Sequence, residues 1–348
     1  MALYNTKADV SNLGNIDPEV SKYLANEGSK NPMLLIPLPT LLQMSRQNAL
    51  PLQAPPGNAL VITIPMRDGH QNGAVVYKPT TVSRSRPLIV LIHGGGFCLG
   101  DNSLMRPHAE ALSILYGAVV VCISYRLAPE FKFPTAPNDV WDNLKWLTIQ
   151  ENAQSLGADL SAGFIVGGTS AGASLAAVTA QKWVTQDVSP CMTGLWLNMP
   201  VLLEKEYVPD QYKELWFSRE QNADAIILNE ASLKFIRSLY EPDMNSPEYS
   251  PFNAESPHQG LPPVYLQVNG NDPVRDDGLI YGKVLRDHGV QTRIDVYPGI
   301  PHGYDDVFPQ LDSSRRQRRD ILKGFGWLLG KDVSEEDCAE ADHKVTSM

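Results

Sequence analysis

Residues 164–172 read FIVGGTSAG, and this stretch decides the fold expected for the 348-residue chain. The apolar run Phe164–Val166 predicts a short buried strand, and the alanine-rich stretch Ala171–Thr185 predicts a helix soon after it. Between them lies Gly168-Thr169-Ser170-Ala171-Gly172, a Gly-x-Ser-x-Gly pattern typical of a sharp strand–turn–helix that exposes a serine. Its two glycines suit a turn in which larger side chains would clash. The alternative interpretation is a tight Gly/Ser-rich turn without chemistry.

Strand and helix patterns alternate on both sides of this stretch. The predicted strands are Leu60–Met66, Gly73–Lys78, Pro87–Ile92, Ala118–Ser124, Phe164–Val166, Leu195–Met199, Val264–Val268 and Thr292–Tyr297. The predicted helices are Ser103–Tyr116, Pro137–Gln150, Ala171–Thr185, Gly278–Asp287 and Ser313–Leu329. The first two strands flank an Asp-Gly turn and predict a hairpin. We therefore expect an α/β fold: a mostly parallel, doubly wound sheet with an antiparallel start and helices on both faces.

Three segments depart from this alternation. Within residues 1–56, the stretch Met33–Leu52 is largely apolar but punctuated by prolines, which favours a segment packed over the rest of the chain, either as a cap or along an edge. Residues 57–330 hold the predicted catalytic domain, and within it residues 204–263 read as an inserted helical cap. Residues 331–348 are acidic and poor in apolar residues, so we expect a disordered tail.

Ser170 is the predicted nucleophile. A serine hydroxyl needs a base to take its proton as it attacks, so a histidine must meet it in the fold. The stretch His93-Gly94-Gly95-Gly96-Phe97 follows a predicted buried strand, and its glycines let the main chain approach a substrate carbonyl. We expect the N–H groups of Gly95, Gly96 and Ala171 to form an oxyanion hole. An anion nest for phosphate is the alternative, but no Lys-Ser/Thr pair follows, as a P-loop requires.

His302 is the predicted general base and acid. It follows a predicted strand and lies between a proline and a glycine, in a loop thirty positions beyond Asp272. Asp272 comes just after another strand, where a carboxylate can orient a histidine and stabilise its charged form. Asp276 and Asp277 are rivals for this role. Both lie where a helix begins, so stabilisation of the helix macrodipole and helix capping are their alternative roles.

The other histidines are expected to have no part in the chemistry. We predict that His93 braces the glycine-rich loop through a hydrogen bond. Five more are expected in solvent or at the surface: His70, His108, His258, His288 and His343. Asp305 and Asp306, close after His302, are likewise expected to be surface carboxylates.

Composition limits the partners and the compartment. A net charge of −10 argues against nucleic acid and against attachment to anionic membranes. The start of the chain lacks the apolar core of a secretory signal, and no apolar run is long enough to span a bilayer. The four cysteines form no Cys-x-x-Cys pair. We expect a cytoplasmic protein with reduced thiols, no cofactor and no metal, acting on a small-molecule ester; the sequence allows a homodimer without indicating one.

The chain closely resembles the hormone-sensitive-lipase-like esterases of the α/β-hydrolase superfamily. The resemblance covers about Leu60–Leu329 and rests on motifs in the family's order. These are His93–Phe97, Tyr125–Glu130, Gly168–Gly172, Asp272–Asp276 and His302-Gly303. It implies an α/β-hydrolase fold with a helical cap and the triad Ser170, Asp272 and His302. Thr169 and Ala173 depart from the family's commoner Asp and Gly.

The sequence thus predicts a serine carboxylesterase that uses no cofactor. Short or medium acyl esters, acetyl esters or lactones of small apolar metabolites are the expected substrates. Two alternatives stay open: an acyltransferase or ring-closing cyclase using the same acyl-serine, and a non-catalytic small-molecule receptor on this fold. Receptor relatives lose the histidine that this chain keeps, which argues against the second alternative.

Overall fold

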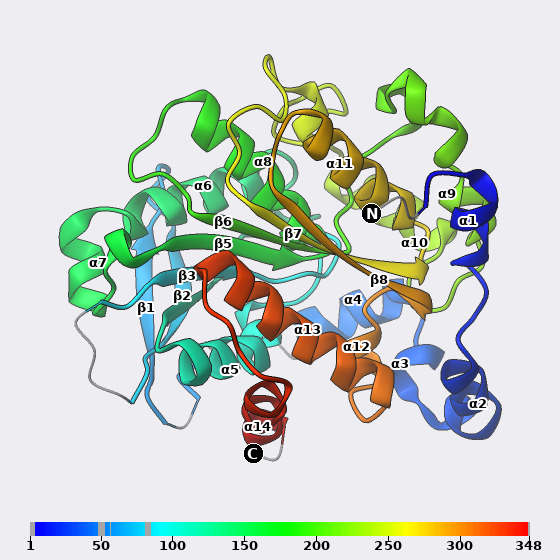
Figure 1. The fold of residues 1–348 in the computed structure, drawn as a ribbon, viewed down its shortest axis with the longest axis horizontal. Coiled ribbons are helices and arrows are strands. Elements are labelled where there is room, and N and C mark those ends of the chain that lie inside the picture. Colours follow the sequence, from blue (N-terminus) through cyan, green and yellow to red (C-terminus); the bar gives the residue numbers. More distant parts are fainter. Residues whose placement is uncertain (1–3, 48–52, 56, 81–84, 347–348) are drawn as a thin grey trace.

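A twisted sheet runs through the molecule in the strand order β1-β2-β4-β3-β5-β6-β7-β8 (Figure 1). The structure is a computed structural model that describes residues 4–47, 53–55, 57–80 and 85–346. The strands are β1 (Ala59–Pro65), β2 (Gln71–Tyr77), β3 (Leu88–Ile92), β4 (Val119–Ile123), β5 (Phe164–Thr169), β6 (Gly194–Asn198), β7 (Val264–Asn271) and β8 (Thr292–Pro301). β2 pairs antiparallel with β1 and β4, and the other neighbours pair parallel. The predicted mostly parallel sheet with an antiparallel start is confirmed.

The central strand pair brings two predicted motifs together. β3 is completely buried and pairs in parallel register with β5, so that Ile92 lies opposite Gly168. Both strands point the same way, and therefore the glycine-rich loop after β3 and the elbow after β5 emerge side by side. Continuous β-branched runs such as these form strands that are covered on both faces.

Helices cover both faces of the sheet (Figure 1). One face packs against α5 (Arg106–Tyr116) and α13 (Asp312–Leu329), and the other against α6 (Thr135–Leu147), α8 (Ala171–Thr185) and α11 (Arg275–Asp287). The other elements are α7 (Gln150–Leu156) and the 3-10 turns η1 (Gly28–Lys30), η2 (Asn102–Met105), η3 (Leu160–Ala162), η4 (Lys205–Tyr207), η5 (Asp210–Leu215) and η6 (Pro251–Asn253). This is the α/β-type layering that the alternating pattern predicts.

The two segments predicted as cap material gather at the end of the sheet toward which the parallel strands point (Figure 1). The first segment contains α1 (Lys7–Asn12), α2 (Pro18–Glu27), α3 (Pro32–Leu35) and α4 (Leu38–Gln47). The insertion contains α9 (Ser218–Gln221) and α10 (Glu230–Tyr240). Positions 1–3, 48–52 and 56 of the first segment lie outside the described residues.

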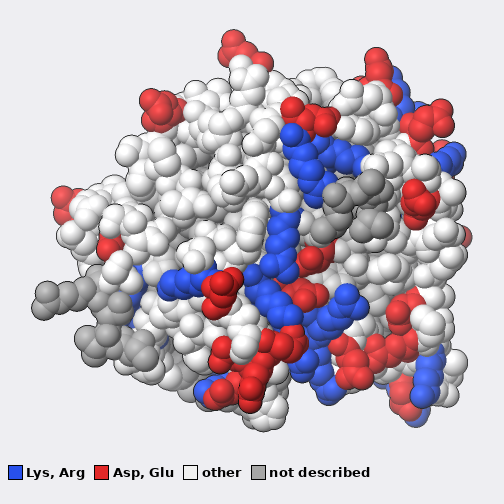
Figure 2. Space-filling view, in the orientation of Figure 1, with Lys and Arg blue, Asp and Glu red and all other residues white. Residues whose placement is uncertain are grey.

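The expectation of a disordered tail is wrong for the described residues. Residues 335–346 form α14 (Glu335–Thr346), which packs against α5 and α13. Cys338 and Ala341 are buried in the core that α5 and α13 share, although the segment is acidic overall. Basic side chains of α13 meet acidic ones of α14, among them Arg318 with Asp342 at 2.6 Å. Figure 2 shows such mixed charges gathered over this part of the molecule. Cys338 and Ala341 are spaced so that both lie on one face of a helix, and burial of this face stabilises α14 although the segment is acidic.

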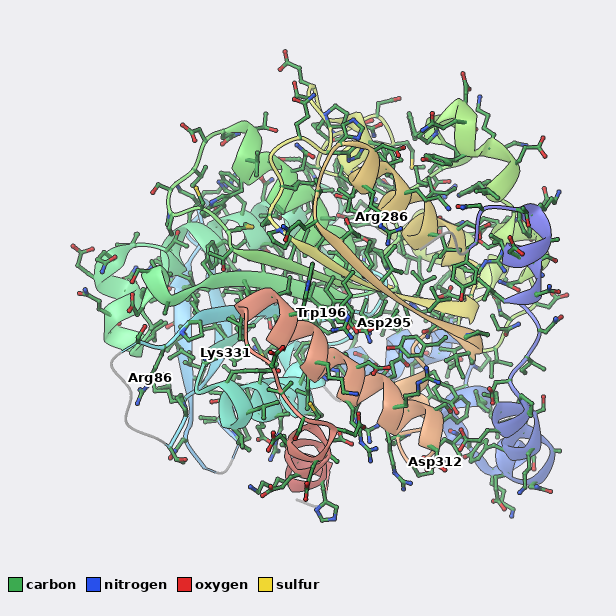
Figure 3. The ribbon with its side chains drawn as sticks, in the orientation of Figure 1. Arg86, Trp196, Arg286, Asp295, Asp312 and Lys331 are labelled. Atoms are coloured by element: carbon green, nitrogen blue, oxygen red, sulfur yellow. The ribbon has the colours of Figure 1, made fainter. Side chains whose placement is uncertain are left out.

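Trp196 of β6 organises the core beneath α13, and it is labelled in Figure 3. It is fully buried, and its ring lies 5.3 Å from that of Phe325 of α13. Its indole N–H donates to Gln267 Oε1 at 2.8 Å, which satisfies the buried polar atom. On its other side the ring of His108 of α5 lies 5.8 Å away, edge-on. The indole therefore connects the sheet to both helices of this face.

No helix in the described parts of the chain combines the length and the apolar character that crossing a bilayer requires.

Candidate active site

Ser170 lies on a strained turn between β5 and α8. Its backbone has φ 54° and ψ −120°, a combination that non-glycine residues rarely adopt. A Cβ at Gly168 would overlap the backbone of Gly172, and a Cβ at Gly172 would overlap the carbonyl oxygen of Ile92. Both glycines of the pattern are thus required by the packing of the turn against β3. The sharp strand–turn–helix predicted for this pattern is present in the structure.

The three side chains predicted to cooperate lie in one hydrogen-bonded chain. His302 Nε2 is 2.8 Å from Ser170 Oγ, and His302 Nδ1 is 2.7 Å from Asp272 Oδ2. Asp272 is fully buried, and its second carboxylate oxygen accepts the Val274 N–H at 2.9 Å. An ionised carboxylate can only accept, so this contact puts a proton on Nδ1 and leaves Nε2 able to accept the serine proton.

The glycine-rich loop lies directly against the elbow. A Cβ on Gly94 would stand 3.0 Å from the Thr169 carbonyl oxygen and 3.3 Å from Ser170 Cβ. Gly95 and Gly96 have φ values of 107° and 60°, which favour glycine. Within the described chain, the N–H groups of Gly95, Gly96 and Ala171 donate no hydrogen bond, and all three residues line the same cavity as Ser170. These amides are available to a ligand oxygen beside the serine.

His93 supports the loop from behind. It is fully buried, with Nδ1 2.7 Å from the Gly94 carbonyl oxygen and its ring stacked on Tyr125 at 4.4 Å. The Tyr125 hydroxyl donates to the His93 carbonyl oxygen at 3.1 Å. From α4, Arg46 donates to the carbonyl oxygens of Cys98 and Ala128 at 3.1 and 2.9 Å. These contacts agree with the predicted bracing role of His93.

Burial of His93 predicts a loss of stability in acid. Desolvation lowers the pKa of His93 from 6.5 to about 4, so the unfolded chain binds more protons at this site between these values. The free energy of unfolding therefore rises with pH across this window and falls on acidification, by about 3 kcal/mol in total. In His93→Gln, the difference in unfolding free energy between pH 6.5 and pH 4, measured by urea denaturation, should be smaller by about that amount.

The exposed His70 provides the control for this experiment. His70→Gln should keep the pH dependence of the wild type. Equal pH dependence in wild type and His93→Gln would contradict a neutral, buried His93.

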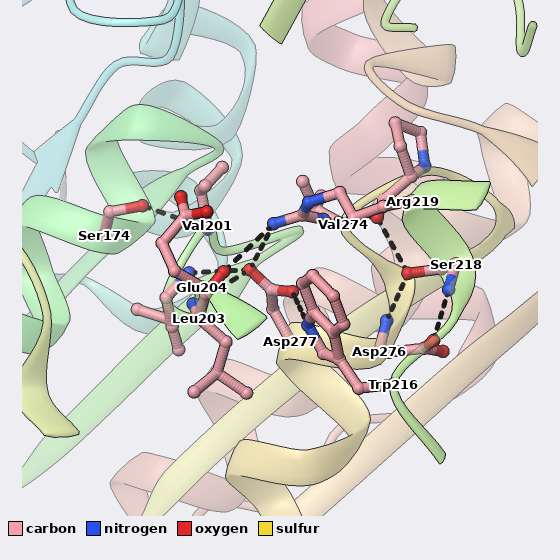
Figure 4. Close-up of polar contacts among 12 residues, drawn as sticks. Ser174, Val201, Leu203, Glu204, Trp216, Ser218, Arg219, Val274, Asp276 and Asp277 are labelled. Carbon is pink, nitrogen blue, oxygen red and sulfur yellow. Dashed lines mark hydrogen bonds and ion pairs between the residues drawn. The ribbon is translucent and has the colours of Figure 1, made fainter. Parts of the chain in front are cut away.

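Asp276 and Asp277 attach the insertion to the body of the protein (Figure 4). Asp276 Oδ2 accepts the N–H groups of Phe217 and Ser218, both at 2.6 Å. Asp277 Oδ2 accepts those of Leu202 and Leu203 at 2.9 and 3.1 Å. Burial raises the pKa of Asp277 to about 6, against the opposing effect of Arg219. Neither residue contacts His302. Both lie in the first turn of α11, as the macrodipole interpretation expects, but neither caps the helix, because their carboxylates accept backbone N–H groups of distant segments.

Two residues that the sequence interpretation missed hold the loop that carries Asp272. The Arg219 guanidinium donates to the Pro273 carbonyl oxygen and pairs with Asp277 at 2.9 Å (Figure 4). The Asn222 side-chain amide donates to the carbonyl oxygen of Asp272 at 2.8 Å. Both belong to the insertion, fifty or more positions away from their partners. No local pattern signals such a contact, since it depends on how the insertion folds back.

A cavity of about 680 Å³ opens over Ser170 and His302. Its apolar lining comes mostly from the two segments predicted as cap material. These residues are Leu34, Leu35, Ile36, Pro37, Leu38 and Leu41 of the first segment, and Ile227, Leu228, Leu233, Ile236, Tyr240 and Tyr249 of the insertion. Ligand sites of this kind are concave, mostly apolar and furnished with a few polar groups. The cavity therefore presents a ligand-sized apolar space to the serine.

Three residues expected in solvent or at the surface are buried. His108 and Asp305 are only 7% exposed, and both line the cavity. His258 is 3% exposed and packs on Phe252 at 4.6 Å. His108 lies on the apolar face of α5 beside Ala109 and Leu112, a periodicity that could have placed it inside.

Across the described ranges, no group of three or more His, Cys, Asp or Glu side chains is arranged to hold a metal ion.

The fold and this arrangement of side chains define the class of protein. A nucleophile elbow after a central parallel strand, followed in chain order by an acid and a histidine, is the arrangement of an α/β-hydrolase. A family model described as an alpha/beta hydrolase fold matches residues 89–306. The chain belongs to this family, among its hormone-sensitive-lipase-like esterases, and it is a carboxylesterase-type α/β-hydrolase.

Comparisons with individual proteins agree with this placement. An AB hydrolase superfamily protein of Schizosaccharomyces pombe is 34% identical over 281 residues, covering 79% of this chain and 81% of the relative. A carboxylesterase of Mycobacterium tuberculosis is 34% identical over 237 residues, covering 66% and 70%. Among solved structures, a vibralactone cyclase superposes with a TM-score of 0.79 at 27% identity, covering 92% of this chain and 96% of that one.

Proposed function

We propose that the protein hydrolyses carboxylic esters through an acyl-serine intermediate, with Ser170 as nucleophile, His302 as general base and acid, and Asp272 as the orienting acid. The observation that carries this proposal is the continuous hydrogen-bonded chain of 2.8 and 2.7 Å from the serine through the histidine to the aspartate. A serine hydroxyl becomes reactive at neutral pH when a positioned base removes its proton during attack. Membership in an esterase family supports the same chemistry.

The first half of the reaction forms the acyl-enzyme. Ser170 Oγ attacks the ester carbonyl carbon while His302 Nε2 takes the hydroxyl proton, and buried Asp272 stabilises the imidazolium. The negative oxygen that develops accepts hydrogen bonds from the amides of Gly95, Gly96 and Ala171, which have no other partner in the described chain. The tetrahedral intermediate collapses, the bond to the alcohol oxygen breaks, and His302 donates its proton to the leaving alcohol.

The second half releases the acid. A water molecule gives a proton to His302 Nε2 as its oxygen attacks the acyl carbon, and the same amides bind the oxyanion again. Collapse of this intermediate returns the proton to Ser170 Oγ and frees the carboxylic acid. The cycle consumes one ester and one water, yields one alcohol and one acid, and needs no cofactor.

The cavity supports small, mainly apolar esters as the substrate class. A volume of about 680 Å³ suits a short or medium acyl chain, or an acetyl ester or lactone of a small metabolite. The carboxylesterase of Mycobacterium tuberculosis, one of the relatives, is named for hydrolysis of this kind of bond.

A second candidate uses the same acyl-serine with another acceptor. The superposition on a vibralactone cyclase favours considering transfer or ring closure, because an internal hydroxyl can replace water in the second half of the reaction. Product analysis by mass spectrometry, with and without an added alcohol, separates the two outcomes. Free acid as the main product supports the hydrolase, and a lactone or a new ester supports the alternative.

Labelling and substrate chain length test the main proposal. We expect a fluorophosphonate to modify Ser170, with peptide mass spectrometry locating the adduct. Turnover of p-nitrophenyl esters should be greatest between acetate and octanoate and should fall for longer chains, because the cavity volume is limited. Labelling of a different serine, or binding of these esters without turnover, would contradict the proposal; the latter would favour a receptor.

A further inference from the structure

Two consecutive carboxylic acids line the cavity just after His302. Asp305 and Asp306 belong to α12 (Tyr304–Val307), and the mechanism proposed above uses neither of them. Asp305 is buried, and its Oδ1 has no hydrogen-bond partner in the described part of the chain. Asp306 also lines the cavity, where its side chain has accessible surface although protein surrounds it. A buried, unpartnered carboxylate oxygen in a ligand cavity requires an explanation.

The cationic groups nearest to these acids do not neutralise them. His108 Nε2 lies 3.8 Å from Asp305 Oδ2, but burial lowers the pKa of His108 and favours its neutral form. The Arg318 guanidinium contacts Asp342 at 2.6 and 3.2 Å and the Pro309 carbonyl oxygen at 3.2 Å. Among the residues that the structure describes, no lysine or arginine forms an ion pair with either acid.

The other charged residues that line the cavity are paired. Glu204 forms an ion pair with Arg237 and also accepts the Tyr249 hydroxyl at 3.0 Å. Arg219 pairs with Asp277 at 2.9 Å. Asp305 and Asp306 thus supply negative charge to an otherwise apolar and charge-balanced cavity. Such charge is costly unless a partner of opposite sign or a proton neutralises it.

In the absence of a ligand, uptake of a proton by Asp306 lowers the energetic cost of holding these two carboxyl groups in the cavity. Desolvation, followed by the charge of Asp305, raises the pKa of Asp306 to about 8, against the opposing effect of the Arg318 charge. Protonation of Asp306 then removes one of the two negative charges. A positively charged ligand group would replace this proton and neutralise the charge directly.

We propose that Asp305 and Asp306 recognise a positively charged nitrogen, so that the preferred substrates are esters with an ammonium group on the acyl or alcohol half. The inference rests on the proposed esterase function, because it names the substrate class of the same cavity. The leucine and isoleucine side chains of the lining would contact the carbon groups around the nitrogen. The two carboxyl groups thereby bind the positive charge of the ester, and apolar side chains bind the rest of the molecule.

Pairs of esters that differ only in charge test this inference. On the alcohol side, butyrylcholine is compared with its carbon isostere 3,3-dimethylbutyl butyrate. On the acyl side, p-nitrophenyl 4-(trimethylammonio)butanoate is compared with p-nitrophenyl 5,5-dimethylhexanoate. In at least one pair we expect kcat/KM to favour the cation by about tenfold. The double variant D305N/D306N should bring that ratio close to one, and the ratio is compared within each protein so that any general loss of activity cancels.

The exposed Asp224, outside the cavity, supplies the charge-matched control, and Asp224→Asn should keep the wild-type ratio. No cation preference in either pair, or a preference that survives in D305N/D306N, would overturn the inference while leaving esterase activity intact. Failure to hydrolyse the neutral esters would instead count against the proposed function. Binding is then decisive: calorimetry with Ser170→Ala should show tighter binding of one cationic ester than of its isostere, and equal affinities would overturn the inference.

Discussion

Replacing Ser170 with alanine is expected to lower kcat for p-nitrophenyl butyrate by about 10⁴- to 10⁶-fold. The substitution removes the atom that would form the acyl-enzyme, while the hydrogen-bonded pair of His302 and Asp272 stays in place at 2.7 Å. Alanine also lacks a side chain large enough to disturb the strained turn. KM should change little, because the cavity and the three free amides are retained. Steady-state kinetics and fluorophosphonate labelling measure both effects.

Ser161 offers the control for this variant. It is an exposed serine just before β5, the strand whose other end leads into Ser170. Ser161→Ala should keep kcat within about twofold of the wild type, as surface substitutions usually do. A folded Ser170→Ala protein that retained more than about one hundredth of wild-type kcat would refute the acyl-serine mechanism.

Asp272→Asn is expected to lower kcat by about 10⁴-fold at neutral pH. An asparagine amide donates where the carboxylate accepted, so it favours the tautomer of His302 that carries its proton on Nε2. That tautomer cannot accept the Ser170 proton, although the positions of the heavy atoms hardly change. Kinetics with p-nitrophenyl butyrate, together with circular dichroism to verify folding, measure the loss.

A second variant, at Asp276, shows which of the two aspartates orients His302, since the sequence alone allowed either. Asp276→Asn keeps the size of the side chain but replaces an ionised acceptor of two backbone N–H groups. We expect it to lower the free energy of unfolding by about 2–3 kcal/mol and to leave kcat of the folded protein within a few-fold of wild type. A larger loss of kcat in Asp276→Asn than in Asp272→Asn would reverse the assignment of the acid.

Local sequence patterns predicted most of the fold and identified individual residues of the candidate site. All of the predicted strands are present, because a continuous β-branched run such as the one ending at Ile92 has few alternatives to a buried strand. The proximity of Gly95 to Ser170 follows from the same pattern, since β3 and β5 are parallel neighbours. The spacing of the glycines and the order of the motifs along the chain were therefore enough to predict which loops meet at the candidate site.

Contacts between distant segments were beyond such patterns. Arg219 supports the loop after Asp272 only because the insertion returns to α11, and nothing near Arg219 in the chain indicates this. Asp305 was expected at the surface because carboxylates are mostly exposed, whereas its burial depends on the packing of α12 against α5 and α13. The tail was misjudged through its acidity, although Cys338 and Ala341 have the spacing of a docked helix.

The contacts that attach the insertion to the rest of the protein suggest how its substrate selectivity can be engineered. The contacts that join the insertion to the start of α11 lie in its first part, where Arg219 pairs with Asp277 and Ser218 contacts Asp276. Most of the apolar wall that the insertion contributes to the cavity follows later, between residues 227 and 249. Residues 227–249 can thus be replaced to suit a different ester, while the contacts of the insertion with Asp276 and Asp277 stay in place. Chimeras joined after Asn222 would inherit the scaffold of one parent and the selectivity of the other.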